Sequence, residues 1–472
     1  MATKVIDFLK RARISKGKVL LVDYLSTEAR ERVHLAGVSL AVECVPGKAL
    51  PAGEANFALL AAVLDQVRLA EDSSVSFEEY LQQWVKRAEA DRAPVVGTER
   101  LPRRCAFVLH ALSREEFFRL RGQKLLARAP QPVRSLAGAV AARLPVVHLG
   151  ALSGAVSRAT GQEVVCDVFA HLAAPQEIGA LGEERIYDRM VQAARLAKGR
   201  GASLLGLGDF IEGVGDGGVT IAQRSPIPVT LGSSYSVSTR LWAARRMLER
   251  LALVQPSADG KRYLAKAMVI GATDSLGRVS SLLLALAAGE LVLVAARPDK
   301  LVELQREIRE VAPGVKVTVA TQAGAELATT DLIVTASSPF SGAVLDLEQV
   351  KPGAVICDGA AGISPADADE RPDVMVVQSG EVLLPGEVRF DFDWGALTPS
   401  VAASMAETVL LTMEGRFESF SLSRQLSLDK VKQIYQLGLR HGATLSQIRG
   451  PHGVIGDEQV KRCRELAFAN RS

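Results

Sequence analysis

The sequence predicts an α/β protein whose main element is a doubly wound parallel sheet. Between residues 263 and 395, strand-like and helix-like segments alternate, as in AKAMVIGA, SLGRVSSLLLALAAG, ELVLVAAR and DKLVELQREIREVA. The strand-like segments are continuously apolar, which is typical of parallel strands buried on both faces. The first strand ends at a glycine and leads at once into a helix, an arrangement typical of a Rossmann-type dinucleotide-binding unit.

The length of 472 residues predicts two to four domains. We expect an additional N-terminal α/β region of unknown role over 1–145, because runs such as GVSLAVECV and CAFVLHAL resemble strands. A mixed α/β substrate lobe is expected over 146–255. There, a helix ends at the glycines of AKGRG, and another helix begins near residue 236. The dinucleotide-binding domain is expected over 256–395. The largely helical segment 396–472 is expected to pack back on the cleft.

The charge and cysteine content exclude several classes of protein. The 56 basic and 53 acidic residues leave a net charge of +3, which gives no electrostatic reason for nucleic-acid binding. Basic side chains clustered at Arg240, Arg245 and Arg246 are interpreted as a solvated helix face. The five cysteines form no CxxC pair, and the six histidines show no metal-ligand spacing. We expect a cytoplasmic protein with no metal.

The sequence shows neither a secretory signal nor a membrane span. Its most apolar stretch, SSLLLALAAGELVLVAA, contains Gly289 and Glu290 and is shorter than the ~20 residues that a span needs. The sequence leaves open whether the protein contacts a membrane surface peripherally and whether it forms a homo-oligomer.

The strand-to-helix turn at residues 271–277 is the predicted nucleotide site. Gly271 suits a tight turn, and Gly277 suits close packing of the helix on the strand. The helix N-terminus would supply NH groups and a partial positive charge to a pyrophosphate. The residues expected to bind the cofactor here are Gly271, Ala272, Thr273, Ser275, Leu276 and Gly277.

Later strand ends extend this site. Arg297 follows the second strand, where a positive side chain suits the 2′-phosphate of NADP(H), although a surface arginine without a ligand is the alternative. Ser337, with Ser338, is expected beside the nicotinamide ribose, and Asp358 and Gly359 near the nicotinamide. Asp274 opposes this interpretation, because it stands where a further glycine would help and its carboxylate would repel phosphate.

Two tips rich in small residues are expected side by side in the substrate lobe. One strand delivers LGLGDF, with Gly208 and Phe210, and another delivers TLGSS, with Gly232, Ser233 and Ser234. Such tips commonly line a cleft, so these five residues are predicted to bind substrate. The alternative is that the glycines only make tight turns.

An ordered set of motifs, LGLGDF, IPVTLGSSYSV, VIGATDSLG, LVLVAARPDKL, VICDGA and AETVLLTMEGRFESFSLSR, resembles the cyanobacterial long-chain acyl-[acyl-carrier-protein] reductases and their wider group of predicted dehydrogenases. The resemblance covers about residues 146–450. It implies NADPH-dependent reduction of a fatty acyl thioester, bound to a carrier protein or coenzyme A, to a fatty aldehyde. It also implies a catalytic residue at Ser404, where those enzymes have a nucleophilic cysteine.

Serine at position 404 leaves three interpretations open. Ser404 lines an acyl pocket while hydride goes directly to a bound carbonyl, or it is an ordinary helix residue, or it is itself the nucleophile. A serine nucleophile needs an activating base, and the sequence places no histidine there. Cys357 is a second candidate nucleophile, with a buried core residue as the alternative. His171, which follows an apolar strand, is interpreted as structural.

The sequence therefore predicts an NADPH-dependent oxidoreductase of the acyl-thioester type. One alternative is a catalytically weakened relative that serves as a binding or scaffolding subunit in a lipid or polyketide pathway, motivated by Asp274 and Ser404. Another is a dehydrogenase of a small hydroxy or amino acid, which follows from the fold only.

Overall fold

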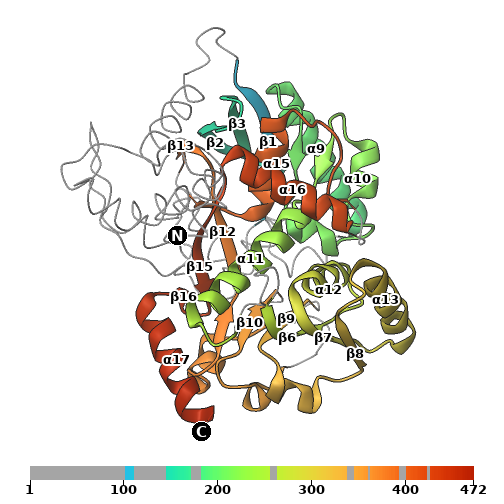
Figure 1. The fold of residues 1–472 in the computed structure, drawn as a ribbon. Coiled ribbons are helices and arrows are strands. Elements are labelled where there is room, and N and C mark those ends of the chain that lie inside the picture. The colour runs from blue at the N-terminus through green and yellow to red at the C-terminus, as the bar shows by residue number, and fades with distance from the viewer. Residues whose placement is uncertain are drawn as a thin grey trace, which may run out of the picture. The chain divides into compact units, whose positions relative to one another are not determined.

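The computed structural model describes residues 101–110, 145–171, 182–255, 263–336, 345–359, 362–392, 400–422 and 426–471, drawn as a ribbon in Figure 1. The chain divides into two compact units, Met1–Glu99 and Arg100–Ser472. All described residues belong to the second unit. The strands and helices predicted before residue 100 lie outside the described residues.

A six-stranded sheet in the second unit is parallel throughout, as predicted. Its order is β11-β10-β9-β6-β7-β8. The strands are β6 (Tyr263–Ile270), β7 (Ala288–Val294), β8 (Lys316–Ala320), β9 (Leu332–Thr335), β10 (Val355–Asp358) and β11 (Met375–Val377). The chain first moves outward from β6 to β8 and then crosses to β9 on the other side. Strand order therefore reverses at β6, which is where ligands bind in sheets of this type.

Helices cover this sheet on both faces, because neighbouring residues on each strand point to opposite sides. Val269 and Leu291 belong to one apolar core, whereas Met268 and Val292 belong to the other. The first face is covered by α11 (Ser233–Leu251), α12 (Ser275–Ala287), α13 (Pro298–Val311) and α17 (Asp457–Arg471). The second is covered by η4 (Gly324–Thr329), η5 (Leu347–Gln349) and α14 (Pro365–Glu370).

A second, mixed sheet has the order β13-β2-β3-β1-β4-β5. Its strands are β1 (Arg103–His110), β2 (Val147–Val156), β3 (Glu163–His171), β4 (Leu205–Gly206), β5 (Val229–Thr230) and β13 (Gly386–Phe390). Strands β3, β1, β4 and β5 are parallel, and β2 and β13 are antiparallel additions. The helical elements described between β3 and β5 are α9 (Glu183–Gly199), η3 (Asp209–Gly213) and α10 (Val219–Arg224).

The strand pairing in the mixed sheet differs from two of the domain boundaries predicted from the sequence. Strand β1 pairs with both β3 and β4, so a boundary at 145 would separate a central strand from its partners. The compact unit begins at Arg100 instead. Strand β13 pairs with β2, so the segment from 386 to 390 leaves the parallel sheet well before residue 395. Backbone pairing with strands distant in sequence is the physical reason for both differences.

Helix α11 joins the two larger sheets (Figure 1). It begins directly after β5 and packs on α12 and β10 of the parallel-sheet region. It also packs on α15 (Ala403–Glu414) and α16 (Leu428–His441). A small antiparallel sheet beside it has the order β14-β12-β15-β16, with strands β12 (Ser379–Leu383), β14 (Ser400–Val401), β15 (Thr444–Gly450) and β16 (Gly453–Val454).

Candidate functional site

The turn after β6 needs both of its glycines. Gly271 has a φ of +80°, and Gly271 and Ala272 both donate their NH groups to the carbonyl of Val294, at 2.9 and 3.0 Å. A Cβ atom on Gly277 would lie 2.0 Å from the carbonyl oxygen of Gly271. The first turn of α12 can therefore approach the end of β6 only if residue 277 has no side chain. The predicted packing role of the two glycines is confirmed, and cofactor binding at this turn stays a prediction.

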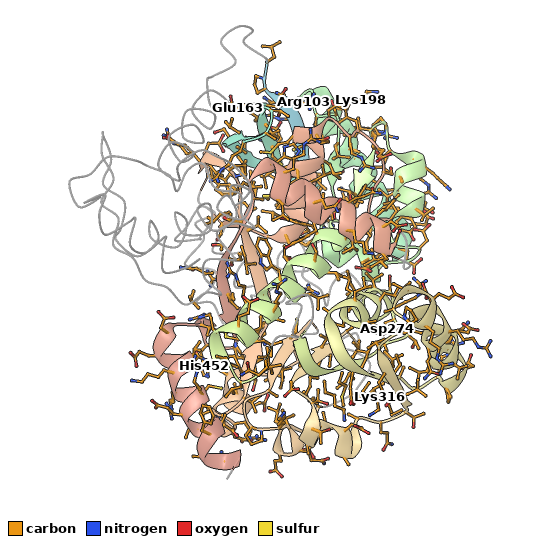
Figure 2. All side chains as sticks on the ribbon, in the orientation of Figure 1. Arg103, Glu163, Lys198, Asp274, Lys316 and His452 are labelled. Atoms are coloured by element: carbon orange, nitrogen blue, oxygen red, sulfur yellow. The ribbon has the colours of Figure 1, made fainter. Side chains whose placement is uncertain are left out.

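Asp274 is the N-cap residue of α12 (Figure 2). Its carboxylate makes no hydrogen bond to the backbone of the helix, and partial desolvation raises its pKa. A negative charge at a helix N-terminus is favourable for the helix itself. The same charge occupies the end of the helix at which a phosphate would bind. The raised pKa indicates that desolvation outweighs this benefit, so the charged carboxylate is unfavourable both for the fold and for a bound pyrophosphate.

The Asp274→Asn variant is expected to bind NADPH about fivefold more tightly, since a carboxylate a few ångströms from phosphate costs on the order of 1 kcal/mol. Because folding raises the pKa of Asp274, its charged form also destabilises the fold, and this destabilisation disappears as the pH falls through that pKa. Fluorescence titration measures the affinity, with Glu310→Gln on α13 as the control. Equal affinities for the wild type and Asp274→Asn would show that the carboxylate lies away from the ligand.

The other predicted residues of the turn have distinct environments. Ala272 is fully buried, and Thr273 and Leu276 are half-buried. The hydroxyl of Ser275 accepts the NH of Leu426 at 3.2 Å. The segment just before α16 therefore reaches the N-terminus of α12.

Arg297 lies at the N-terminus of α13, three residues after β7 ends. Its side chain is 65% exposed, and its Nη2 lies 3.4 Å from Oδ2 of Asp299. An exposed ion pair of this kind contributes little stability, so the guanidinium remains available to an anion. The position is the one that the sequence predicted for contact with a 2′-phosphate.

Asp358 is buried and already fully engaged. Its carboxylate accepts hydrogen bonds from the Thr335 hydroxyl at 2.8 Å, the Ile363 NH at 3.0 Å and the Gln378 amide at 3.3 Å. These hydrogen bonds fix the chain after β10, and the contact of Asp358 with a cofactor stays a prediction. A Cβ atom on Gly359 would lie 2.6 Å from the Thr335 carbonyl oxygen, so glycine is required by packing here. Ser337 and Ser338 lie outside the described residues.

Cys357 does not fit the role of nucleophile. Burial raises the pKa of its thiol to about 11, so the thiol is protonated at neutral pH. Its Sγ atom donates to the Arg240 carbonyl, 3.8 Å away. The physical reason for this correction is that the strand end is covered by α11, which removes water from the thiol.

Arg240 is the residue at this edge that sequence reasoning missed. Its Nη1 atom would lie 3.5 Å from a Cβ on Gly359, and Arg240 lines a small cavity of about 20 Å³ together with Thr335 and Cys357. The interpretation of Arg240 as part of a solvated helix face is therefore wrong. It stands three residues after the buried Val237 on α11. That helical spacing is the signal that could have placed it on the inner face.

The two predicted tips of the substrate lobe do lie side by side. Strands β4 and β5 pair in parallel with Gly206 opposite Thr230, so Gly208 and Gly232 follow at matching positions. Both glycines have positive φ values, +75° and +89°. The backbone of Phe210 follows in η3, and its side chain lies outside the description.

Ser404 packs directly against Gly232. A Cβ atom on Gly232 would lie 2.3 Å from both Cα and Cβ of Ser404. Ser404 is the second residue of α15, and Gly232 is the N-cap of α11. The N-termini of two helices therefore meet at this contact, and each contributes a partial positive charge. No histidine among the described residues is hydrogen-bonded to Ser404.

Glu407 holds this junction together, and the sequence analysis did not single it out. Its fully buried carboxylate accepts the Thr230 hydroxyl at 2.5 Å, the Tyr235 NH at 2.9 Å and the Ser421 hydroxyl at 2.8 Å. The hydroxyls of Ser233 and Ser234 are also occupied, by Glu212 and Ser421, both at 2.7 Å. These two serines therefore also have a structural role, and their contact with substrate stays a prediction.

Two histidines end neighbouring strands of the mixed sheet. His110 on β1 stands opposite His171 on β3, with ring centroids 5.6 Å apart. Burial lowers the pKa of His110 to about 4 and that of His171 to about 3, so both are neutral at physiological pH. His110 donates through Nε2 to the Leu207 carbonyl at 2.8 Å. A pKa this low makes each imidazole a weak base, so neither histidine is suited to accept a proton from a substrate at neutral pH.

Within the described ranges, no group of three or more histidine, cysteine or carboxylate side chains is placed to hold a metal ion. No described helix has the length and apolar character that crossing a membrane requires.

Comparison with known sequences gives limited similarity. No family model matches the chain. The aminotransferase PigE of Serratia sp. (strain ATCC 39006) is 29% identical over 266 residues, which cover 54% of this chain and 30% of that protein. The match thus spans less than a third of the length of PigE.

Three similar solved structures are aspartate transcarbamoylase from Trypanosoma cruzi, shikimate 5-dehydrogenase from Listeria monocytogenes and quinate dehydrogenase from Corynebacterium glutamicum. Their TM-scores are 0.30, 0.29 and 0.28, at 14%, 10% and 12% identity. The matches cover 67%, 60% and 78% of this chain and 86%, 88% and 99% of those chains. The two dehydrogenases were solved with NAD. At such scores, the Rossmann-like assignment rests on the strand order of this chain.

Proposed function

We propose that this chain is an NADPH-dependent reductase that delivers hydride to the carbonyl carbon of an acyl thioester. The observation that carries this proposal is the turn with Gly271 and Gly277 at the reversal of strand order in the parallel sheet. The residues fit a dinucleotide: the turn leaves no room for a side chain at 277, and Arg297 offers an exposed cation after the next strand. When bound, NADPH supplies the hydride.

The second lobe supplies groups that stabilise developing negative charge. Hydride addition converts a carbonyl oxygen to an oxyanion, which prearranged NH groups stabilise. The N-termini of α11 and α15 meet at Gly232 and Ser404. Eight residues of α11 separate Gly232 from Arg240, about 12 Å along the helix. The Glu407 carboxylate already accepts the Tyr235 NH in the first turn of α11, so the N-terminus of α15 and the guanidinium of Arg240 are the positive groups near which we place the substrate.

Direct hydride transfer fits the described residues better than a covalent acyl-enzyme. Cys357 is protonated, and no described histidine contacts Ser404. The overall reaction consumes the thioester, NADPH and one proton, and it yields an aldehyde, a free thiol and NADP⁺. The carbon–sulfur bond breaks after hydride addition, and the thiol leaves with the proton.

The test has two stages. Nicotinamide fluorescence is first titrated with NADPH and with NADH, and then acyl-coenzyme A and acyl-carrier-protein thioesters are supplied while NADPH oxidation and trapped aldehyde are measured. Aldehyde formation would support the proposal, whereas failure to bind either nucleotide would overturn it. Loss of turnover in Ser404→Ala with NADPH binding intact would instead assign a covalent role to that serine.

Asp274 favours a second candidate function, a binding subunit that has lost reduction. Its carboxylate lies at the end of α12 where phosphate would bind. This candidate predicts that thioesters bind without turnover and that nucleotide binding is weak in the wild type. Restored nucleotide binding in Asp274→Gly, still without turnover, would support it.

The Arg297→Ala variant is expected to bind NADPH at least about tenfold more weakly, while its NADH affinity changes less than about twofold. The reason is that an arginine–phosphate hydrogen-bonded pair contributes about 1.5–3 kcal/mol, and only NADPH carries the 2′-phosphate. Fluorescence titration with both nucleotides measures the ratio. Arg309→Ala, at the far end of α13, is the control. An unchanged ratio of the two affinities would place the phosphate contact elsewhere.

A further inference from the structure

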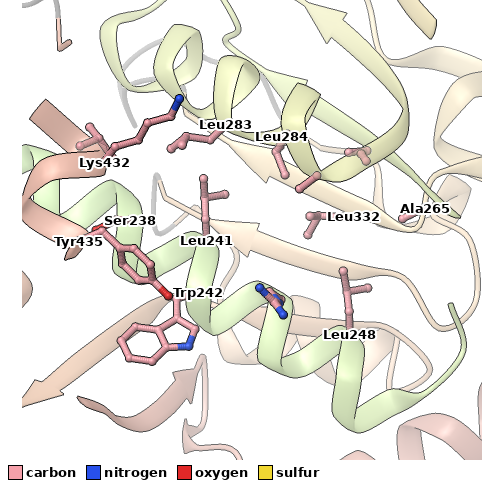
Figure 3. A pocket seen from close by; sticks show the side chains of 15 residues that line it. Ser238, Leu241, Trp242, Leu248, Ala265, Leu283, Leu284, Leu332, Lys432 and Tyr435 are labelled. Atoms are coloured by element: carbon pink, nitrogen blue, oxygen red, sulfur yellow. The ribbon is translucent and has the colours of Figure 1, made fainter. Parts of the chain in front are cut away.

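A pocket of about 260 Å³ lies between α11, α12, α16 and one face of the parallel sheet. It is separate from the turn at Gly271. On α11, the lining residues recur every three or four positions, so a single face of the helix borders the pocket. Figure 3 shows Lys432 and Tyr435 on one side of the pocket and Leu332 and Ala265 on the other.

Small residues on the sheet create this space. Ala265 and Ala267 on β6 and Ala288 on β7 face the pocket, where buried parallel strands usually carry valine, isoleucine or leucine. Leu283 and Leu284 of α12 and Leu248 of α11 supply the remaining apolar wall. Apolar side chains that face an empty space lack dispersion contacts on that side, so a bound apolar group would be favoured there.

One side of the pocket is charged. Lys432 on α16 is exposed, and no carboxylate of the described segments pairs with it. Arg245 also borders the pocket and pairs with Glu249 at 2.9 Å. The rings of Trp242 and Tyr435, which also line the pocket, meet edge to face with centroids 5.6 Å apart. The pocket thus has a cationic and aromatic side and an aliphatic interior.

We propose that this pocket binds a single-chain amphiphile with an anionic head group at Lys432 and an apolar body of about ten carbons. The length follows from volume: an apolar cavity of about 150 Å³ holds benzene, so 260 Å³ holds about ten carbons. A lysine ammonium is a compact point charge that suits a carboxylate or a phosphate monoester. The apolar walls provide the affinity and the cation fixes the orientation.

The site is independent of the proposed reductase function. The pocket borders Ala288 and Leu332, the first residues of β7 and β9, whereas the turn at Gly271 lies at the opposite ends of the strands. Five residues of β6 separate Ala265 from Ile270, about 16 Å along the strand. The amphiphile is therefore a second ligand that does not displace a nucleotide.

Isothermal titration calorimetry of the full chain with decanoate tests the proposal. We expect sub-millimolar affinity with a stoichiometry of about one. Decyl phosphate should bind comparably, decylamine at least tenfold more weakly, and butyrate without measurable heat. Saturating NADPH should leave the decanoate affinity unchanged. Failure of decanoate to bind, equal binding of decylamine, or mutual displacement with NADPH would each overturn the proposal.

Two variants localise the site. Lys432→Glu should weaken decanoate binding at least tenfold, whereas Lys461→Glu, an exposed lysine on α17, should stay within about twofold. Ala267→Leu should abolish binding by filling the pocket, with thermal unfolding as the check that it folds. Lys432 is exposed, so its variant tests the site even if Ala267→Leu is unstable. Unchanged affinity in Lys432→Glu would overturn the proposed orientation and the site.

Discussion

Replacing Glu407 by alanine is expected to destabilise the second compact unit by about 3–5 kcal/mol. The buried carboxylate accepts hydrogen bonds from Thr230, Tyr235 and Ser421. Its removal leaves the Thr230 hydroxyl and the Tyr235 NH without this acceptor, whereas the Ser421 hydroxyl can donate to Ser234, 2.7 Å away. Each unsatisfied donor costs about 1–3 kcal/mol, and a small cavity adds to that. In thermal unfolding, Tm should fall by about 5 °C.

The Glu407→Gln variant separates charge from shape. Glutamine keeps the volume, but its amide NH₂ must face one of the existing donors, so we expect it to recover only part of the lost stability. Glu418→Ala, on the surface beside Arg416, is the matched control and should change Tm by less than about 2 °C. If Glu407→Ala unfolded at the wild-type temperature, the junction between α11 and α15 would not depend on this carboxylate.

Replacing Gly277 by alanine is expected to weaken NADPH binding at least about a hundredfold and to destabilise the fold by about 2–3 kcal/mol. The new Cβ would lie 2.0 Å from the Gly271 oxygen and 2.8 Å from its carbonyl carbon, both backbone atoms that cannot rotate away. Either α12 moves off β6 or the turn opens, and both changes displace the NH groups at the helix N-terminus. Fluorescence titration and thermal unfolding measure the two effects.

Gly199→Ala provides the control for this substitution. A Cβ on Gly199, at the end of α9, would meet no heavy atom within 4 Å. Its stability should change by less than about 1 kcal/mol and its nucleotide affinity should not change. Retention of full NADPH affinity in Gly277→Ala would exclude this turn as the nucleotide site and would remove the observation that carries the proposed function.

The parallel sheet could be predicted from sequence because each strand is a short apolar run, and the residues directly after it end the strand. The helix α9 was predictable for a similar reason, since it ends at Gly199 and Gly201 adopts a φ of +88°. These signals lie within a few residues of the element that they define. The turn at Gly271 belongs to the same class, because its glycines act on backbone only a few positions away.

The remaining features depend on contacts between residues distant in sequence. The role of Glu407 appears only when β5 and α11 approach it from more than 170 positions away. Ser234, which was predicted to bind substrate, is likewise hydrogen-bonded to the distant Ser421. Asp358 was predicted as a cofactor ligand from its position at a strand end. Its hydrogen bonds with the Ile363 NH and the Gln378 amide were not predictable from that position. Sequence placed the backbone at the site and could not assign its side chains.

The central place of β1 in the mixed sheet limits how the chain can be shortened. Strand β1 lies between β3 and β4, with Cys105 opposite Cys166 and Ala106 opposite Leu205. A fragment that begins at residue 146 would lack this strand and would present two unpaired parallel edges where one continuous ladder stood. Exposed edges of that kind pair with other chains and aggregate. Expression of a minimal soluble fragment should therefore begin near Arg100, where the compact unit starts.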